Sequence, residues 1–259
     1  MKITEKINNS RYTFKQILSD EWDTSVISDY SIEEIDKIYT NVNESDPYLN
    51  SKDFGNGFIC NIRLPHLVLK NFNLHIIYYN FPKLSIDSTS NKVTKQIADK
   101  ILKLYENEYL NSSDSVIVVI NEKVSESIQK YINNLNINLY DSLLVEGLNK
   151  DILKDFEDNN LIFGEDYNFN HFKNVQIIDI NAVTNNLFDH RLVPEHVVIR
   201  DKKEINKILE ECNANINQLP IILKEDIIAK LKRMSSGDIC KIKRNNEKCG
   251  ENIFYRVCK

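Results

Sequence analysis

RLVPEHVVIR, residues 191–200, is the stretch that decides how the C-terminal part of this chain folds. Its β-branched residues predict a short strand, and Pro194 favours the edge or the start of a sheet because it has no N–H group to donate. Asp201 and Glu204 follow with the spacing of a capping box. They predict a helix with apolar residues at helical spacing: Ile205, Ile208, Leu209 and Cys212.

The residues after this helix predict a second, shorter helix and a hairpin. Asp226 can cap a helix that carries Ile228 and Leu231. Two strands are predicted beyond it, over residues 239–244 and 252–258, around a loop that contains Gly250. Alternate residues of the second strand share one face: Ile253, Tyr255 and Val257.

Several short motifs in this region have one consistent order and spacing. They are LVPEHVV (192–198), NQLP (217–220), the pair Asp226 and Ala229, GDICKIKR (237–244) and FYRV (254–257). In that order they resemble the C-terminal assembly domain of the fifth subunit shared by the eukaryotic nuclear RNA polymerases, a family that includes its smaller counterpart in archaeal polymerases. The resemblance covers about the last quarter of the chain.

The resemblance implies that this region binds the largest polymerase subunit, although a structural role in the core or in a turn is the alternative for each residue. The family's Arg after QLP is replaced by Ile221, its Pro after Asp226 by Ile227, and its Thr-Ala before the glycine by Lys248-Cys249. Loss of the Arg removes a planar set of donors, so the partner surface is expected to differ too. The positions expected to bind the partner are Pro194, Glu195, His196, Gln218, Leu219, Pro220, Asp226, Arg244, Gly250, Tyr255 and Arg256.

The N-terminal part of the chain predicts helices and strands in alternation. Helices are expected over residues 11–20, from the Ser31 cap onward, over 92–109 and from Val124, the last with Ile128, Ile132 and Leu135 on one face. Strands are expected over residues 58–64, 66–70, 74–79, 115–120 and 175–180, and polar connections over 41–52 and 82–91. The strand SVIVVI (115–120) is apolar on both faces, which is typical of a central strand covered by helices.

These elements predict an α/β (α+β) fold. Residues 1–135 are expected to form an N-terminal α/β jaw domain, which the resemblance makes similar in topology to restriction endonucleases. Residues 136–188 are expected to form an acidic, Asn-rich insertion and a connecting strand, with a short helix near 151–156. Residues 189–259 are expected to form a small two-layer α/β assembly domain.

Charge is distributed unevenly along the chain, whose formal net charge is −5. Residues 189–259 carry 15 Lys and Arg against 11 Asp and Glu, and residues 1–188 carry 18 against 27. This mildly basic end is far from the basic stripe of a dedicated nucleic-acid binder. No apolar run approaches the roughly 20 residues that cross a bilayer, and the first residues lack the apolar core of a signal peptide, so no membrane partner is expected. The Cys residues are scattered, which predicts reduced thiols that serve as small apolar residues.

The sequence contains only incomplete matches to catalytic motifs. Gly55 and Gly57 form G-x-G without a third glycine, which is typical of a turn, and the His residues have no metal-ligand spacing. A nuclease of the restriction type needs Glu-x-Lys on a strand, whereas Glu122 and Lys123 are adjacent and would point to opposite faces. His196 could be a general base, but a structural or interface role is the expectation.

The loop after SVIVVI is the expected site of DNA contact. The resemblance places it beside the incoming duplex, where Lys123, Ser125 and the amides at the helix start could touch phosphate without reading sequence. Glu122 and Glu126 would oppose such contact.

The predicted function is therefore that of a non-catalytic subunit of a multisubunit DNA-dependent RNA polymerase. It would bind the largest and neighbouring subunits, border downstream duplex DNA and need no cofactor of its own. It is expected inside the cell: in the virion and host cytoplasm if the source is a large DNA virus, or in the nucleus if it is an AT-rich protist. The alternatives are a stand-alone DNA-binding or adaptor protein with the same C-terminal module, and a degenerate nuclease.

Overall fold

The computed structural model describes residues 1–40, 54–82, 92–246 and 250–259. They pack as two compact units. The N-terminal unit consists of Met1–Asp155 with Phe172–Asn185, and the C-terminal unit consists of Phe156–His171 with Asn186–Lys259. The expected division at residues 135 and 188 stays a prediction. The expected linker over 41–52 and nearly all of the connection over 82–91 lie outside the described residues.

The N-terminal unit is built around one sheet of mostly parallel strands. The strand order is β1-β2-β3-β4, with β1 antiparallel to β2 and the other neighbours parallel. Its elements are α1 (Ile3–Ile17), α2 (Ile32–Thr40), β1 (Ile62–Pro65), β2 (Asn73–Tyr79), α3 (Gln96–Glu106), β3 (Ser115–Ile120), α4 (Glu126–Glu146), β4 (Val175–Asp179) and α6 (Ile180–Val183); α5 (Lys150–Asp158) follows α4 in the chain.

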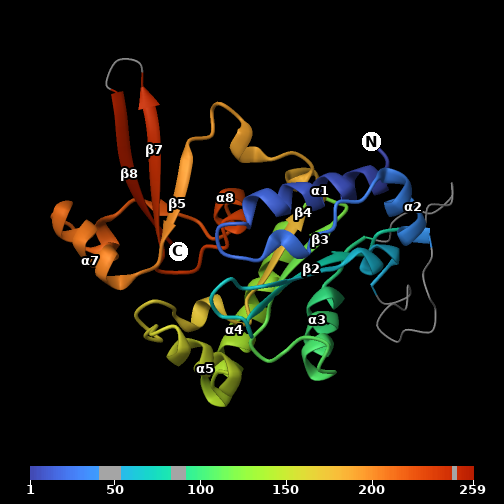
Figure 1. The fold of residues 1–259 in the computed structure, drawn as a ribbon, viewed down its shortest axis with the longest axis horizontal. Coiled ribbons are helices and arrows are strands. Elements are labelled where there is room, and N and C mark those ends of the chain that lie inside the picture. Colours follow the sequence, from blue (N-terminus) through green and yellow to red (C-terminus); the bar gives the residue numbers. More distant parts are fainter. Residues whose placement is uncertain (41–53, 83–91, 247–249) are drawn as a thin grey trace. The chain divides into compact units, whose positions relative to one another are not determined.

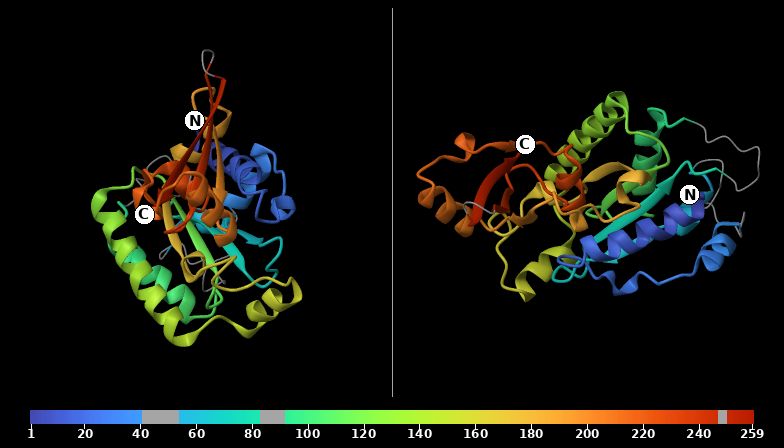
Figure 2. Two further views of the ribbon diagram at one scale, coloured as in Figure 1. Left: turned by 90° about the vertical axis from the view of Figure 1, so that its left-hand side faces the viewer. Right: turned by 90° about the horizontal axis from the view of Figure 1, so that it is seen from above.

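Helices cover both faces of this sheet, so the α/β prediction is confirmed. Figures 1 and 2 show α1 on one side of β2 and β3, and α3 with α4 on the other. Every residue of β3 is buried, as SVIVVI predicts for a strand between two layers of helices. On the α1 side, the Ser10 hydroxyl lies 2.8 Å from the hydroxyl of Tyr78. On the α3–α4 side, Val118 packs with Ile101 and Ile132.

A buried carboxylate fixes the beginning of strands β2 and β3. Asp114, which is 1% exposed, accepts hydrogen bonds at Oδ1 from the backbone N–H and the side-chain amide of Asn73, each over 3.1 Å. Its Oδ2 lies 3.0 Å from Nε2 of His75 and 3.2 Å from the backbone nitrogen of Asn111. One side chain therefore joins β2 to the turn that precedes β3.

Three of the predictions for the first elements are wrong. The strand expected over residues 58–64 begins only at Ile62, because residues 56–60 form a 3-10 helix. The first helix begins at Ile3 and not near Arg11, because Ile7 and Ser10 continue the buried stripe through a run that looks polar. The segment 66–70 is not a strand. Nδ1 of His66 accepts from the backbone nitrogens of Val68 and Leu69, over 3.1 and 2.9 Å, which closes a turn there instead.

The helix that starts after Val124 extends further than predicted. It runs through Asn136 to Glu146, with Leu139 and Leu143 buried. Asn136 makes a paired contact with β4: its amide donates to the carbonyl of Val175 and accepts from the Val175 backbone nitrogen, both over 2.8 Å. Asn136, which was expected to be the first residue of a polar insertion, therefore anchors α4 to the edge strand β4.

The C-terminal unit has a sheet of order β5-β7-β8-β6. Strands β5 and β8 are each antiparallel to β7, and β6 is parallel to β8. Figure 1 shows β7 and β8 as the two long arms of one hairpin. The elements are β5 (Glu195–Ile199), α7 (Lys202–Glu211), the 3-10 turn Ile216–Gln218, β6 (Ile221–Ile222), α8 (Ile227–Leu231), β7 (Ile239–Asn246) and β8 (Gly250–Cys258).

The predicted helix caps form with one difference. Oδ1 of Asp226 accepts from the nitrogen of Ile228 over 2.8 Å, so α8 keeps its cap without the family's proline. Oδ1 of Asp201 accepts from Lys203 over 2.7 Å, but the reciprocal bond from Glu204 that would complete a capping box is not formed.

The thiols of Cys60, Cys240 and Cys258 are free and buried as predicted, and burial raises their pKa to about 12, about 11 and about 12. Cys212 is exposed, so the prediction is wrong there because this position lies on the outer side at the end of α7; Cys249 is outside the described residues.

Candidate functional site

The strand register gives the C-terminal sheet two chemically different faces. On one face, Ile199, Ile239 and Val257 pack against Ile205 and Ile208 of α7. We call it the α7 face. On the opposite face, called the α8 face, the sheet residues Val198, Cys240, Ile242 and Cys258 pack with Ile222, Ala229 of α8 and Met234. Each helix covers only one end of the sheet, so the rest of both faces is lined by strand residues.

Several of the expected partner-binding residues meet on the α8 face. His196 of β5 and Phe254 of β8 both pair with the buried Ile242 of β7, so the three lie in one row. Arg244 is two residues further along β7 and therefore shares this face. Arg256 pairs with Cys240 on the same side. Residues that are as many as 60 positions apart in the chain thus form one continuous patch, which we call the α8-face patch.

His196 is the buried centre of this patch. Its Nδ1 lies 2.7 Å from the carbonyl oxygen of Pro194, and its ring meets the ring of Phe188 edge-on at 6.3 Å. Burial lowers the pKa of His196, and the positive charges of Arg244 and Lys232 act in the same direction. The hydrogen bond to Pro194 and the charge of Asp226 oppose them. The neutral imidazole is favoured, with Nδ1–H donating to the carbonyl.

Cations and an exposed ring form the rim of the patch. The guanidinium of Arg244 lies 5.1 Å from the centre of the Phe254 ring, which is 47% exposed. Nη1 of Arg256 donates to the carbonyl of Ile221 over 3.1 Å. Arg side chains stacked on aromatic rings are enriched at protein interfaces, since their stems are apolar and their donors are planar. Sequence reasoning missed Phe254, although its spacing from Arg256 places it on the same face.

The other expected residues lie elsewhere in the C-terminal unit. Tyr255 is on the α7 face, where burial, followed by the charges of Glu211, Cys212 and Glu204, raises its pKa. Glu195 is also on that face and pairs with Lys243 over 3.1 Å. Gly250 begins β8 with a φ of +72°.

The residues of the motif NQLP make contacts within the C-terminal unit. Leu219 is 8% exposed and belongs to the α7-face core. The carbonyl of Pro220 accepts from the nitrogen of Val257 over 2.9 Å, which starts the pairing of β6 with β8. Gln218 Oε1 accepts from the backbone nitrogen of Asn215 over 2.7 Å.

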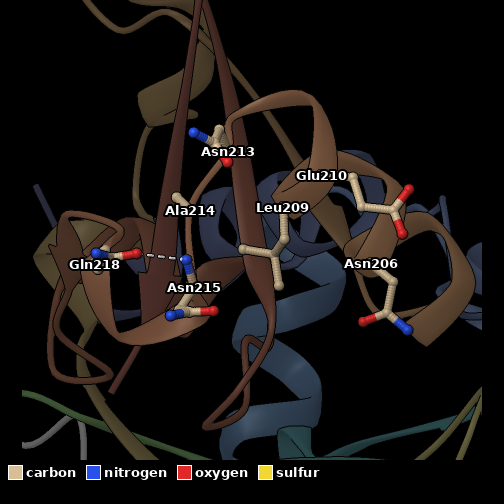
Figure 3. A pocket seen from close by; sticks show the side chains of 7 residues that line it. All are labelled: Asn206, Leu209, Glu210, Asn213, Ala214, Asn215 and Gln218. Carbon is tan, nitrogen blue, oxygen red and sulfur yellow. Dashed lines mark hydrogen bonds between the residues drawn. The ribbon is translucent and has the colours of Figure 1, made fainter.

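A shallow polar pocket of about 450 Å³ lies beside this turn (Figure 3). Leu209 stands between the side-chain amide of Asn206, in the middle of α7, and those of Asn215 and Gln218 in the turn that follows. Of the expected partner-binding residues, Gln218 alone lines it, and its carbonyl oxygen already caps the turn. The pocket is lined by Asn206, Leu209, Glu210, Asn213, Ala214, Asn215 and Gln218.

The segment Phe156–His171, which sequence reasoning assigned to an insertion, packs within the C-terminal unit. Nε2 of His171 lies 3.4 Å from Oδ1 of Asp238, and its Nδ1 lies 3.2 Å from the hydroxyl of Ser235. Asp238 is 2% exposed, and its Oδ2 also accepts from the nitrogen of Ser235 over 2.8 Å. These buried contacts hold the segment against the turn before β7.

In the N-terminal unit, the loop after β3 presents the two residues expected near DNA. The side chain of Lys123 is exposed. The hydroxyl of Ser125 accepts from the nitrogen of Ile128 over 3.4 Å, so it caps α4. Glu122 is engaged elsewhere, since its Oε1 accepts from the nitrogen of Val93 over 2.5 Å. Lys123 is therefore the residue of this loop best placed to meet an anion.

No three His, Cys, Asp or Glu side chains converge to hold a metal ion within residues 1–40, 54–82, 92–246 and 250–259. In the same part of the chain, no helix has the length and apolar character that a bilayer crossing requires.

Comparison with known proteins gives the C-terminal region its family. Residues 185–258 match the family model described as RNA polymerase Rpb5, C-terminal domain. The DNA-directed RNA polymerase subunit Rpo5 of Methanosphaera stadtmanae is 38% identical over 71 residues, which are 27% of this chain and 91% of that relative. Rpo5 of Sulfurisphaera tokodaii is 45% identical over 67 residues, which are 26% of this chain and 79% of that relative.

A eukaryotic relative matches as well. The subunit rpabc1 of DNA-directed RNA polymerases I, II, and III of Dictyostelium discoideum is 36% identical over 73 residues, which are 28% of this chain and 36% of that relative. The archaeal relatives are matched over most of their own length, and the matched residues contain β5, both helices and the hairpin. The chain therefore belongs to the Rpb5 (Rpo5) family of RNA polymerase subunits.

Proposed function

We propose that this chain is a non-catalytic subunit of a multisubunit DNA-dependent RNA polymerase, and that its C-terminal unit docks on the largest subunit. Nucleotide addition would take place on other chains. The α8-face patch is the observation that carries the proposal, because it brings His196, Arg244 and Arg256 together on one face of a family domain. Asp226, whose charge acts on His196, lies close to them.

The physical character of the patch suits a protein partner. An exposed ring under a guanidinium, beside a buried imidazole, offers apolar area and planar donors in the same place. Tyr255, Pro220 and Gly250 contribute to the docking surface from the neighbouring edge of the sheet in this proposal. The contribution of each single residue is separable by mutation.

The N-terminal unit serves in this proposal as a jaw beside downstream DNA. Lys123 is exposed in the loop before α4, where it can meet phosphate without reading sequence. The Ser125 hydroxyl is occupied as a helix cap, so the backbone amides and Lys123 are the groups left for such contact. The polymerase would act inside the cell, and the departures from the family's motifs suit a divergent lineage such as a large DNA virus.

Co-purification from the native source tests the docking. We expect a tagged chain to recover the largest polymerase subunit, and Arg244→Gln to recover less of it. Lys207→Gln is the matched control, since it also removes one charge but lies on the exposed side of α7, with its side chain 75% exposed. Recovery of the chain alone would contradict the proposal and would favour a stand-alone adaptor protein. If Arg244→Gln and Lys207→Gln recover equal amounts of the largest subunit, the α8-face patch is not part of the docking surface.

A further inference from the structure

The outer edge of β8 is covered over only a small part of its length. Strand β8 runs from Gly250 to Cys258, but β6 pairs only with Val257 and Cys258. Strand β7 occupies the other side of β8 from Ile239 to Asn246. Among the described residues, no strand therefore pairs with the outer edge of β8 before Val257.

The hydrogen bonds near Val257 determine which groups this edge presents. The nitrogen of Val257 donates outward to the carbonyl of Pro220 over 2.9 Å, whereas Cys258 donates inward to the carbonyl of Asp238 over 2.8 Å. Because backbone groups alternate along a strand, Tyr255 and Ile253 must also direct their N–H and C=O groups outward. Phe254 and the other residues between them direct theirs toward β7. The edge thus offers regularly spaced donors and acceptors.

This edge has little protection against pairing. Ile253 and Phe254 are 45% and 47% exposed, and their side chains lie on opposite faces of the sheet. Residues 251–256 contain no proline, and β8 pairs with β7 residue by residue without a bulge. Isolated proteins usually protect such edges with prolines, inward charges or bulges. The opposite edge strand of the sheet, β5, begins directly after Pro194.

The side chains along the edge define the chemistry of the strand that would fit it. On the α8 face, Arg244 and Arg256 lie beside Phe254, so a carboxylate is favoured there. On the α7 face, the neighbour is the exposed Ile253, so an apolar side chain is favoured. We propose that an extended segment of a neighbouring polymerase subunit, with alternating acidic and apolar residues, adds to the outer edge of β8 as a further strand. This inference rests on the proposed function and names how the docking occurs.

Amide hydrogen exchange at single-residue resolution tests the edge in the free, full-length chain. The amides of Ile253 and Tyr255 are expected to exchange quickly, and those of Phe254 and Arg256 slowly, because only the latter donate to β7. In the polymerase that co-purifies with the tagged chain, all four should be protected, with at least tenfold slowing at Ile253 and Tyr255. Unchanged exchange at these two residues in the assembled polymerase would overturn the proposal.

A proline substitution separates the backbone from the side chain. Ile253→Pro removes an outward N–H and leaves the bonds to β7, so we expect a folded chain with at least tenfold lower recovery of polymerase. Ile253→Thr, which keeps the N–H, should recover polymerase within about twofold of the parent chain. Phe254→Pro removes a hydrogen bond to β7 and serves as a control. Its thermal midpoint shows how much a damaged hairpin destabilises the chain.

The outcomes distinguish the possible failures. Equal recovery by Ile253→Pro and Ile253→Thr, with thermal midpoints like that of the parent, would overturn strand addition while leaving the proposed function intact. If the parent itself recovers no polymerase, the proposed function fails first. If Ile253 and Tyr255 become protected in the free chain as its concentration rises, the edge pairs with a second copy, and a polymerase strand is ruled out as its occupant.

Discussion

Nδ1 of His196 lies 2.7 Å from the carbonyl oxygen of Pro194, so the imidazole is tied to the residue that precedes its own strand. The bond fixes the ring beneath the exposed part of the α8-face patch, in the row of Ile242 and Phe254. The spacing of Pro194 and His196 at the start of β5 therefore has a structural reason. It orients a buried polar ring beside the apolar side chain of Ile242.

The first prediction concerns the pH dependence of stability. Burial lowers the pKa of His196 below its ordinary value of 6.5. The contribution of its neutral form to stability is therefore complete above about 6.5, and it is lost as the pH falls toward the lowered pKa of the folded state. Urea unfolding at pH 7.5 and 5.5 should show a larger loss of stability in the parent than in His196→Asn. Equal losses would mean that His196 does not titrate differently on folding.

The second prediction separates the cap of α8 from the interface. Asp226→Ala removes the acceptor for the nitrogen of Ile228 and should lower the free energy of unfolding by about 0.5–2 kcal/mol. Asp226→Asn keeps a capping oxygen and removes the charge. Thermal unfolding of both variants, with polymerase recovery measured in parallel, distinguishes the roles. If Asp226→Asn is as unstable as Asp226→Ala, the charge and not the cap is what stabilises α8.

The third prediction concerns Asp114 in the N-terminal unit. Asp114→Ala leaves the donors of Asn73, Asn111 and His75 without their acceptor in a buried place, and should destabilise the unit by about 3–5 kcal/mol. Asp114→Asn retains one oxygen acceptor, so its loss should be smaller. Urea denaturation followed by tryptophan fluorescence can measure both, since Trp22 is buried in this unit. A loss below about 1 kcal/mol for the alanine variant would contradict this account.

The fourth prediction compares two glycines with positive φ. Gly55 has a φ of +82°, and a Cβ there would lie 2.8 Å from the carbonyl oxygen of Phe81. Gly250 has a φ of +72° with open space around it. Gly55→Ala should therefore lower the free energy of unfolding by on the order of 3 kcal/mol, because strain and overlap add. Gly250→Ala should lose about 1 kcal/mol, and a reversed order in chemical denaturation would refute the comparison.

The fifth prediction tests the loop before α4. If Lys123 meets phosphate, the isolated chain should bind duplex DNA more tightly as salt is lowered, and Lys123→Glu should weaken that binding severalfold. Lys130→Glu, which changes another exposed lysine within α4, is the control. Fluorescence anisotropy with labelled duplex measures the affinity at several salt concentrations. Equal binding by the parent and Lys123→Glu would exclude Lys123 from DNA contact.

The elements with strong periodicity were predictable from the sequence. SVIVVI formed a fully buried strand because apolar residues occupied both faces of it. The Asp226 cap and the hairpin ending at Cys258 followed from local rules that need no distant partner. The strand predicted over residues 66–70 does not form, because the ring of His66 accepts hydrogen bonds from the backbone nitrogens of Val68 and Leu69. β propensity takes no account of such side-chain bonds.

The candidate site was predicted as a set of positions and not as a surface. The motif order identified His196, Arg244 and Arg256, but it could not indicate that Leu219 is core or that Tyr255 faces the other side. Phe254 was missed because an aromatic residue between Ile253 and Tyr255 resembles ordinary strand core. Its 47% exposure depends on tertiary packing, which no local pattern contains.

The sequence by itself determined the family, because motif order and spacing survive wherever a fold is kept, and it determined the elements whose hydrogen bonds close within a few residues. Only the tertiary structure decided which face each strand residue occupies. It also decided how much of the sheet is covered by helices and how much of the edge of β8 is covered by β6. Those properties depend on pairings between residues far apart in the chain, such as Val257 with Pro220 and Asn136 with Val175. Such bonds form only after the intervening chain has folded back.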